Sequence, residues 1–112
     1  MTYEETRQIL TVLRTAYPQS FLHWSKEQGE AFLSLWSKGL QDEDLLDVMV
    51  AVWHFIQDTD REFAPTIGMV RKYVKSTPHY RMEEAAIKYF PERSDVKALV
   101  QSRRIAIGHE EA

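Results

Sequence analysis

The sequence contains no cysteine, and this absence is the first of several that limit what the protein can be. Without cysteine there is no disulfide framework, no cysteine-ligated zinc and no cysteine nucleophile. The four glycines are scattered, so no glycine-rich loop can cradle phosphates, and we expect no ATP hydrolysis by this chain. The longest apolar run, VMVAVW (48–53), is far shorter than the roughly 20 residues of a membrane span. The amino end also lacks the basic and apolar regions of a signal peptide, which favours a cytoplasmic protein.

Carboxylates and histidines are present, but their spacing matches no metal or catalytic motif. Asp58, Asp60 and Glu62 begin like a calcium-binding loop. However, Phe63 stands where such a loop requires glycine, and Met69 stands where it requires a bidentate glutamate. The four histidines are dispersed and form no HExxH motif. We therefore predict no enzyme, no cofactor and no metal site.

What the sequence does contain is helical periodicity behind recognisable helix starts. Thr2 with Glu5, and Ser25 with Gln28, have the spacing of capping boxes. Apolar side chains recur at intervals of three and four residues behind each pair, as one face of an amphipathic helix requires. Gly39 is placed to close the second helix in the left-handed conformation.

A third helix is predicted to follow, with Asp42 as its N-cap and further acidic residues in its first turn. Residues 45–56 carry apolar side chains on two sides, which indicates a helix that is central in a bundle. The β-branched residues could also suit a strand, but the length of the segment favours a helix. The predicted fold class is all-α.

The segment REFAPTIGMV (61–70) interrupts this pattern. Pro65 breaks the long helix, and Thr66 is a natural N-cap for the next one. We predict a hinge at Pro65 and Gly68. The hinge would divide a compact bundle of three to four helices (1–65) from a looser helical C-terminal arm (66–112).

Two alternatives to this division follow from the composition. A domain of 65 residues would be only modestly stable, so part of residues 66–90 could pack back and complete the core. The corner at Pro65 could then be an ordinary turn between helices of a single bundle. Equal resistance to proteolysis on both sides of Pro65 would favour this second interpretation.

The net charge of −3 is unevenly distributed. Residues 1–65 hold five basic and eleven acidic side chains, whereas residues 66–112 hold nine basic and six acidic ones. Such an asymmetry suggests that the two halves face different partners or each other, with ordinary variation of a solvated surface as the alternative.

Three segments together resemble a known family: MTYEETRQILTVLRTAYP (1–18), LSLWSKGLQDEDLLDVMVAVWHFI (33–56) and FAPTIGMVRKYV (63–74). The features that they share with the family are a helix ending in Ala-Tyr-Pro, a tryptophan near the end of the second helix, an acidic start to the third helix, and Phe-x-Pro-[Ser/Thr]-Ile-Gly at the start of the fourth. In this order and at this spacing they are similar to the helicase loader and inhibitor proteins of phages that infect Gram-positive bacteria. The resemblance covers about the first 75 residues.

The resemblance implies an accessory protein of DNA replication and no enzyme. Members bind the hexameric, ATP-bound replicative helicase of the phage, hold it inactive and deliver it to the origin-binding initiator protein. The family has an ordered helical N-terminal domain and a flexible C-terminal part that engages the helicase. We accordingly expect a monomer in the host cytoplasm, with no membrane contact and little or no direct DNA binding.

We hypothesise that the arm after Pro65 docks an apolar stripe on the helicase, with two arginines steering it towards acidic groups. The acidic N-terminal bundle would then meet the initiator. The predicted helicase-binding residues are Val96, Leu99, Val100, Arg103, Arg104 and Ile105.

The alternative function is a DNA-binding protein that organises the replisome without sequence preference. It would place Arg71, Lys72, Lys75, Arg103 and Arg104 on phosphates. The acidic net charge counts against this function, because a dedicated DNA-binding domain usually has a net basic face. A small adaptor with an unrelated partner is a third possibility that composition does not distinguish.

Overall fold

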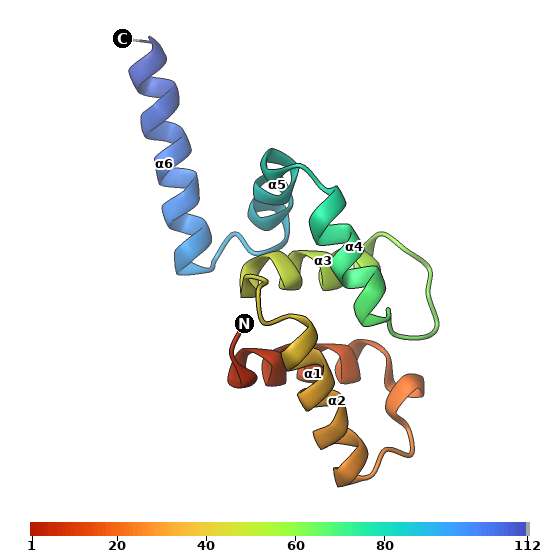
Figure 1. Cartoon of the computed structure of the whole chain (residues 1–112). Helices are drawn as coiled ribbons and strands as arrows, with labels where there is room; N and C mark the ends of the chain where they lie inside the picture. The colour runs from red at the N-terminus through yellow and green to blue at the C-terminus, as the bar shows by residue number, and fades with distance from the viewer. Residues whose placement is uncertain (112) are drawn as a thin grey trace. The chain divides into compact units, whose positions relative to one another are not determined.

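The structure is a computed structural model that describes the backbone of residues 1–111 and the side chains of residues 1–102. In this range it contains only helices, which confirms the predicted all-α class (Figure 1). The elements are α1 (Tyr3–Ala16), the 3-10 helix η1 (Pro18–Phe21), α2 (Lys26–Gly39), α3 (Leu45–Gln57), α4 (Ile67–Ser76), α5 (His79–Tyr89) and α6 (Ser94–Glu111).

The chain forms two compact units, Met1–Ser76 and Thr77–Ala112, which we call the N-terminal unit and the C-terminal unit. The division predicted at residue 65 and the hinge predicted at Pro65 and Gly68 concern how the parts of the chain move relative to each other, which a single structure does not test. They therefore stay predictions, to be tested by the exchange and cleavage experiments below.

In the N-terminal unit, α1 contacts both α2 and α3, and α4 packs on α3 (Figure 1). These four helices share one hydrophobic core, and Val70 of α4 belongs to it. Residues after position 65 therefore do pack on the core of this unit, as the alternative in the sequence analysis allowed. Its fully buried apolar side chains include Ile9, Leu13, Leu40, Val48, Val52 and Val70.

Both predicted capping boxes are present. The Thr2 hydroxyl accepts a hydrogen bond from the Glu5 amide at 3.1 Å, and the Glu5 carboxylate accepts one from the Thr2 amide at 2.8 Å. Ser25 and Gln28 make the same pair of bonds at 3.2 and 2.8 Å. Because these bonds satisfy amides that the first turn leaves unpaired, they fix where α1 and α2 begin.

The prediction that Asp42 caps the third helix is wrong by two residues, because Asp44 is the N-cap of α3. The amide of Glu43 donates to the carbonyl of Leu40 at 3.0 Å, so Asp42 lies in a turn that leaves α2. The central position of the helix is as predicted. Four side chains of α3 are fully buried: Val48, Val50, Ala51 and Val52.

The predicted left-handed conformation of Gly39 is also wrong, because no glycine of the described chain has a positive φ. Gly39 is instead the last residue of α2, and a β-carbon there would overlap Cδ1 of Ile67 in α4. Among the described residues, a β-carbon at Gly68 would meet only the Thr66 hydroxyl, at an ordinary 3.8 Å. The close approach that requires glycine is therefore at Gly39.

Two hydrogen bonds hold the end of the segment that joins α3 to α4, one before Pro65 and one after it. The Ala64 amide donates to the Ser20 hydroxyl of η1 at 2.8 Å, and Pro65 is buried. Thr66 caps α4 as predicted, since its hydroxyl accepts from the Met69 amide at 3.2 Å.

The C-terminal unit consists of α5 and α6, which contact each other. As predicted, α6 begins at Ser94 and Asp95. The Asp95 carboxylate accepts two hydrogen bonds from the Arg93 guanidinium, each 3.0 Å long, and one from the Val96 amide at 2.9 Å. These donors, the Arg93 guanidinium above all, hold the pKa of Asp95 below its ordinary value.

Candidate functional site

The predicted helicase-binding residues all fall on α6. Val96 is fully buried, whereas Leu99 and Val100 are partly exposed. The side chains of Arg103, Arg104 and Ile105 lie outside the described residues. Docking through Val96 would therefore require a rearrangement around α6, while Leu99 and Val100 present surface as they stand. The assignment of these residues to the helicase stays a prediction.

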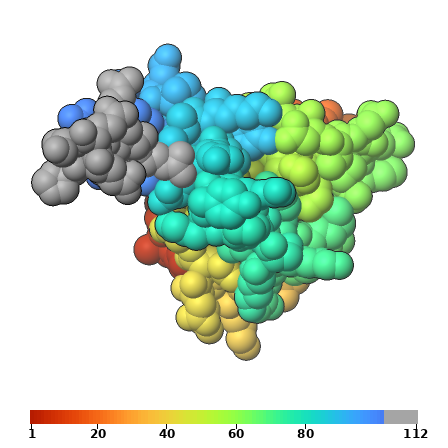
Figure 2. All heavy atoms as spheres, turned by 90° about the horizontal axis from the view of Figure 1, so that it is seen from above, coloured from red at the N-terminus to blue at the C-terminus, as the bar shows by residue number. Residues whose placement is uncertain are grey.

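The residues of the DNA-binding alternative that the structure describes fall on α4. Arg71, Lys72 and Lys75 are exposed and occupy an arc of roughly 100° on the helix, given its 3.6 residues per turn. Figure 2 shows part of the surface of α4, in the colours between green and turquoise. Tyr73 points elsewhere and stacks on His54 of α3, with 4.4 Å between ring centroids. The basic residues of α4 thus form a solvated face, while the opposite face packs on α3.

The histidine–carboxylate pairs lie on helix surfaces. His54 of α3 is 3.4 Å from Asp58, the residue that caps the end of that helix, and His79 is 2.9 Å from Glu83 in α5; each pair is four residues apart. Within the described residues there is no group of three or more potential ligands that could hold a metal ion. These pairs are typical of side chains one helical turn apart.

An open groove in the N-terminal unit is a feature that the sequence did not indicate. It has a volume of about 630 Å³ and lies between α1 and the N-terminal half of α2. We call it the α1–α2 groove. The buried side chains of Leu10 and Leu33 form its floor. Its lining consists of Tyr3, Arg7, Leu10, Thr11, Arg14, Trp24, Ser25, Lys26, Gly29, Glu30, Leu33 and Ser34.

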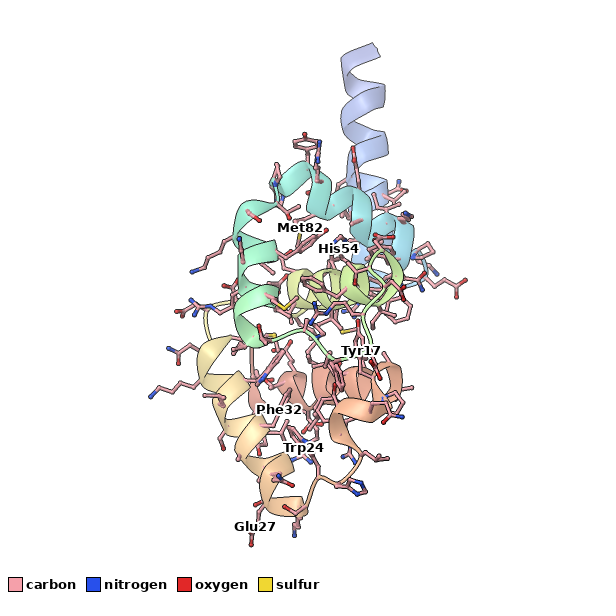
Figure 3. The ribbon with its side chains drawn as sticks, turned by 90° about the vertical axis from the view of Figure 1, so that its right-hand side faces the viewer. Tyr17, Trp24, Glu27, Phe32, His54 and Met82 are labelled. Atoms are coloured by element: carbon pink, nitrogen blue, oxygen red, sulfur yellow. The ribbon has the colours of Figure 1, made fainter. Side chains whose placement is uncertain are left out.

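Trp24 is held at the groove by a cluster of aromatic rings. Its ring centroid lies 4.7 Å from that of Phe21 and 5.4 Å from that of Phe32, both in edge-on contacts. Phe32 in turn stacks on the buried Trp36 at 4.7 Å. Figure 3 shows Trp24 and Phe32 close together, with Glu27 pointing away from them at the start of α2. Such contacts fix the orientation of Trp24 beyond what area burial alone would do.

The periodic spacing on each helix explains the groove, but only after the pairing of the helices is known. Tyr3, Arg7 and Arg14 recur along one stripe of α1, and Lys26, Glu30 and Leu33 along one stripe of α2. A single stripe of this kind is indistinguishable from an ordinary solvated helix edge. Only the packing of α1 on α2 brings the two stripes together.

The described part of the chain is therefore an all-α protein of two units, which presents helix faces and, in the N-terminal unit, an open groove. In the described part of the chain, no helix has the length and hydrophobicity needed to cross a membrane. Among known protein families, residues 1–71 match the family described as G39P, N-terminal domain. The chain belongs to this family, the N-terminal domain of phage helicase loaders.

The family match confirms the resemblance found in the sequence. It covers more than half of the chain and falls inside the N-terminal unit, ending within α4. The family is a helicase-loader domain and not a catalytic one. Neither a search of curated proteins nor a search of solved structures gave a match.

Proposed function

We propose that the protein binds the hexameric, ATP-bound replicative helicase of the phage, holds it inactive and delivers it to the initiator protein at the origin. The observation that carries this proposal is the match of residues 1–71 to a helicase-loader domain, which includes α1, α2, α3 and half of α4. The chain has no glycine-rich phosphate loop, so the helicase supplies the nucleotide chemistry. The protein acts in the host cytoplasm, as a monomer.

The two units divide the work in this proposal. The N-terminal unit meets the initiator, and α6 of the C-terminal unit meets the helicase. The C-terminal unit consists of one helix of 11 residues and one of 18, and helices with so few packing partners are marginal in water. A segment that gains order on contact binds reversibly, because the ordering cost offsets part of the contact energy. Reversible binding suits a factor that must release the helicase after delivery.

A charge-matched pair of variants tests the role of α6. The first variant, Leu99→Glu with Val100→Glu, places two carboxylates on the partly exposed apolar positions. The control, Gln101→Glu with Ser102→Glu, adds the same charge at neighbouring exposed positions. We expect the first variant, and not the control, to lose co-elution with the helicase hexamer in the presence of ATP. Deletion of residues 92–112 should have the same effect as the first variant.

Co-elution of the deletion variant at the level of the intact chain would sink the assignment of α6. Inhibition is measured separately, as helicase unwinding of a forked substrate with increasing amounts of the intact protein. Failure of the intact chain to co-elute with the helicase under any nucleotide condition would contradict the proposed function as a whole.

DNA binding is the second candidate function, and the exposed face of Arg71, Lys72 and Lys75 on α4 favours it. A complex held by these residues would weaken steeply with salt, since each phosphate contact releases counterions. Replacing all three with glutamine would abolish such binding. Helicase loading predicts instead that DNA affinity is weak from the start and that helicase co-elution survives the triple substitution.

A further inference from the structure

We propose that the α1–α2 groove is a docking site for an acidic segment of a partner protein, with an apolar side chain of that segment seated on the groove floor. This inference concerns the N-terminal unit only and does not depend on which residues contact the helicase. It commits to a protein segment of stated chemistry. Three independent features of the groove lead to it: its charge, a bare helical glycine and its apolar floor.

The lining of the groove has an excess of basic side chains, although residues 1–65 as a whole are acidic. Residues 1–65 contain five basic side chains, and three of them, Arg7, Arg14 and Lys26, line this groove. Glu30 is the single carboxylate in the lining, although residues 1–65 contain eleven acidic side chains. A basic concave surface on an otherwise acidic unit attracts a negatively charged ligand and directs it to this position.

Two of the three cations are available for such a ligand. Arg7 lies 3.6 Å from the Glu4 carboxylate and 5.6 Å from the centre of the Tyr3 ring. In the part of the chain whose side chains are described, Arg14 and Lys26 form no ion pair. Incoming carboxylates would meet these two side chains without displacing an existing partner.

Gly29 is the second feature. It lies inside α2, where glycine is less favourable than alanine because the unfolded chain loses more freedom. Its φ is not positive, and a β-carbon added to it would meet no atom of the described residues within 4 Å. Neither backbone conformation nor packing within the chain therefore explains this glycine. Since Gly29 lines the groove, the bare backbone is a surface on which a docked segment can lie closely.

The floor distinguishes a protein segment from a nucleic acid. It is built from the aliphatic side chains of Leu10 and Leu33, which suit an apolar anchor. Proteins that bind single strands combine a continuous basic track with aromatic faces on which bases stack. Here the three basic side chains of the lining share the groove with Glu30 and form no continuous track, and residues 1–65 as a whole are acidic, which disfavours a phosphate backbone. The volume of about 630 Å³ lies within the range of roughly 300–1,000 Å³ that is typical of ligand-binding clefts.

A titration of the isotope-labelled full chain with two synthetic peptides tests the proposal. The first peptide is a short helix former that carries glutamates and leucines, and the second has lysine in place of every glutamate. We expect only the acidic peptide to shift the signals of the Gly29 amide and the Trp24 indole. Arg14→Gln with Lys26→Gln should weaken its binding about tenfold. Lys38→Gln, an exposed position of α2 outside the groove lining, should leave the affinity unchanged.

Gly29→Ala gives a test in which stability and binding change in opposite directions. The variant should raise the melting temperature of the free protein, because it favours the helix and fills open space. It should also weaken binding of the acidic peptide, because the new methyl group occupies the contact surface. Gly68→Ala in α4, outside the groove, is the matched control and should leave peptide binding as it is.

Three results would overturn the proposal. The first is equal binding of the acidic and basic peptides, and the second is unchanged affinity of the acidic peptide for both the Arg14→Gln, Lys26→Gln variant and the Gly29→Ala variant. The third is displacement of the acidic peptide by a single-stranded oligonucleotide, which would make the groove a nucleic-acid site. Helicase co-elution of the same variants is measured in parallel. Normal co-elution together with lost peptide binding separates this inference from the proposed function.

Discussion

Gly39 at the end of α2 touches Ile67 at the start of α4, and the contact leaves no room for a β-carbon on Gly39. The two residues are far apart in the sequence, yet they join the helix that lines the α1–α2 groove to the helix that carries the basic face. Protein interiors are close-packed, so an added methyl group at such a point must displace its neighbour. The contact therefore couples the position of α4 to that of α2.

A double-mutant cycle measures this coupling. Gly39→Ala gains up to about 1 kcal/mol from helix propensity but must displace Cδ1 of Ile67. Ile67→Val removes that carbon. We expect Gly39→Ala to be more favourable when it is combined with Ile67→Val than in the parent, with a coupling energy of about 1 kcal/mol. The measurement is denaturant unfolding of the four proteins. Additive effects would mean that the two residues do not constrain each other.

The hydrogen bond from the Ala64 amide to the Ser20 hydroxyl leads to a second prediction. Ser20→Ala leaves a partly buried amide without its acceptor, which costs about 1–3 kcal/mol. The loss should loosen residues 58–66, so we expect faster cleavage of this corner in limited proteolysis. Ser34→Ala, at an exposed position of α2, is the control and should be cleaved at the parent rate. Unchanged cleavage of Ser20→Ala would show that Pro65 and the α4 cap hold the corner without this bond.

Tyr17 is buried, and its hydroxyl has no hydrogen-bond partner among the residues whose side chains are described. Because a buried unpaired hydroxyl is unfavourable, Tyr17→Phe should be neutral or stabilising by about 1 kcal/mol at neutral pH. Tyr3→Phe, which alters an exposed tyrosine of α1, is the control and should leave the stability unchanged. A clear loss of stability in Tyr17→Phe would mean that the hydroxyl has a partner in solution, such as an ordered water.

The pKa of Tyr17 also leads to a prediction about stability at alkaline pH. Burial raises the pKa of Tyr17 above its ordinary value, with the nearby charge of Arg61 acting in the opposite direction. The folded protein then holds this proton more tightly than the unfolded chain. The free energy of unfolding should accordingly fall as the pH rises above about 10. Thermal melts of Tyr17→Phe should lack this part of the alkaline loss, and parallel curves for the two proteins would contradict the assignment.

The sequence predicted those parts of the structure that local interactions decide. The capping boxes of Thr2 and Ser25 and the cap at Thr66 each depend on residues within one helical turn, and all three are present. The start of α3 was misplaced because Asp42 and Asp44 are equally good caps by composition. The choice between them depends on the turn that leaves α2.

Contacts between distant segments could not be predicted in the same way. Gly39 suggested a left-handed helix end, yet the reason for glycine there is Ile67, which lies on another helix. The bond between Ala64 and Ser20 and the α1–α2 groove likewise depend on how helices pair. The family resemblance did indicate a helicase-loader domain, because its features recur as a pattern along residues 1–74.

Asp95 leads to a prediction about acidic pH. The Arg93 guanidinium lowers the pKa of the Asp95 carboxyl in the folded chain, so the contribution of Asp95 to the start of α6 is present above its ordinary pKa. That contribution is lost as the pH falls through the lowered value. We expect Asp95→Asn to lower the protection of the Val96 amide against exchange at neutral pH. The loss of this protection that the parent shows at acidic pH should be absent from the variant. Glu92→Gln, an exposed neighbour, is the control and should behave like the parent.

Amide hydrogen exchange of α4 distinguishes the two places at which the chain could divide. Val70 of α4 is fully buried in the core that contains Val52 of α3, so we expect the amides around these two residues to exchange at similar, slow rates. The amides of α6 should exchange faster in the free protein and slow down when the helicase and ATP are added. Fast exchange throughout α4, at the rate of α6, would instead favour the hinge predicted at Pro65. Slow exchange in α6 of the free protein, equal to that of α3, would contradict the proposal that this helix gains order from the helicase.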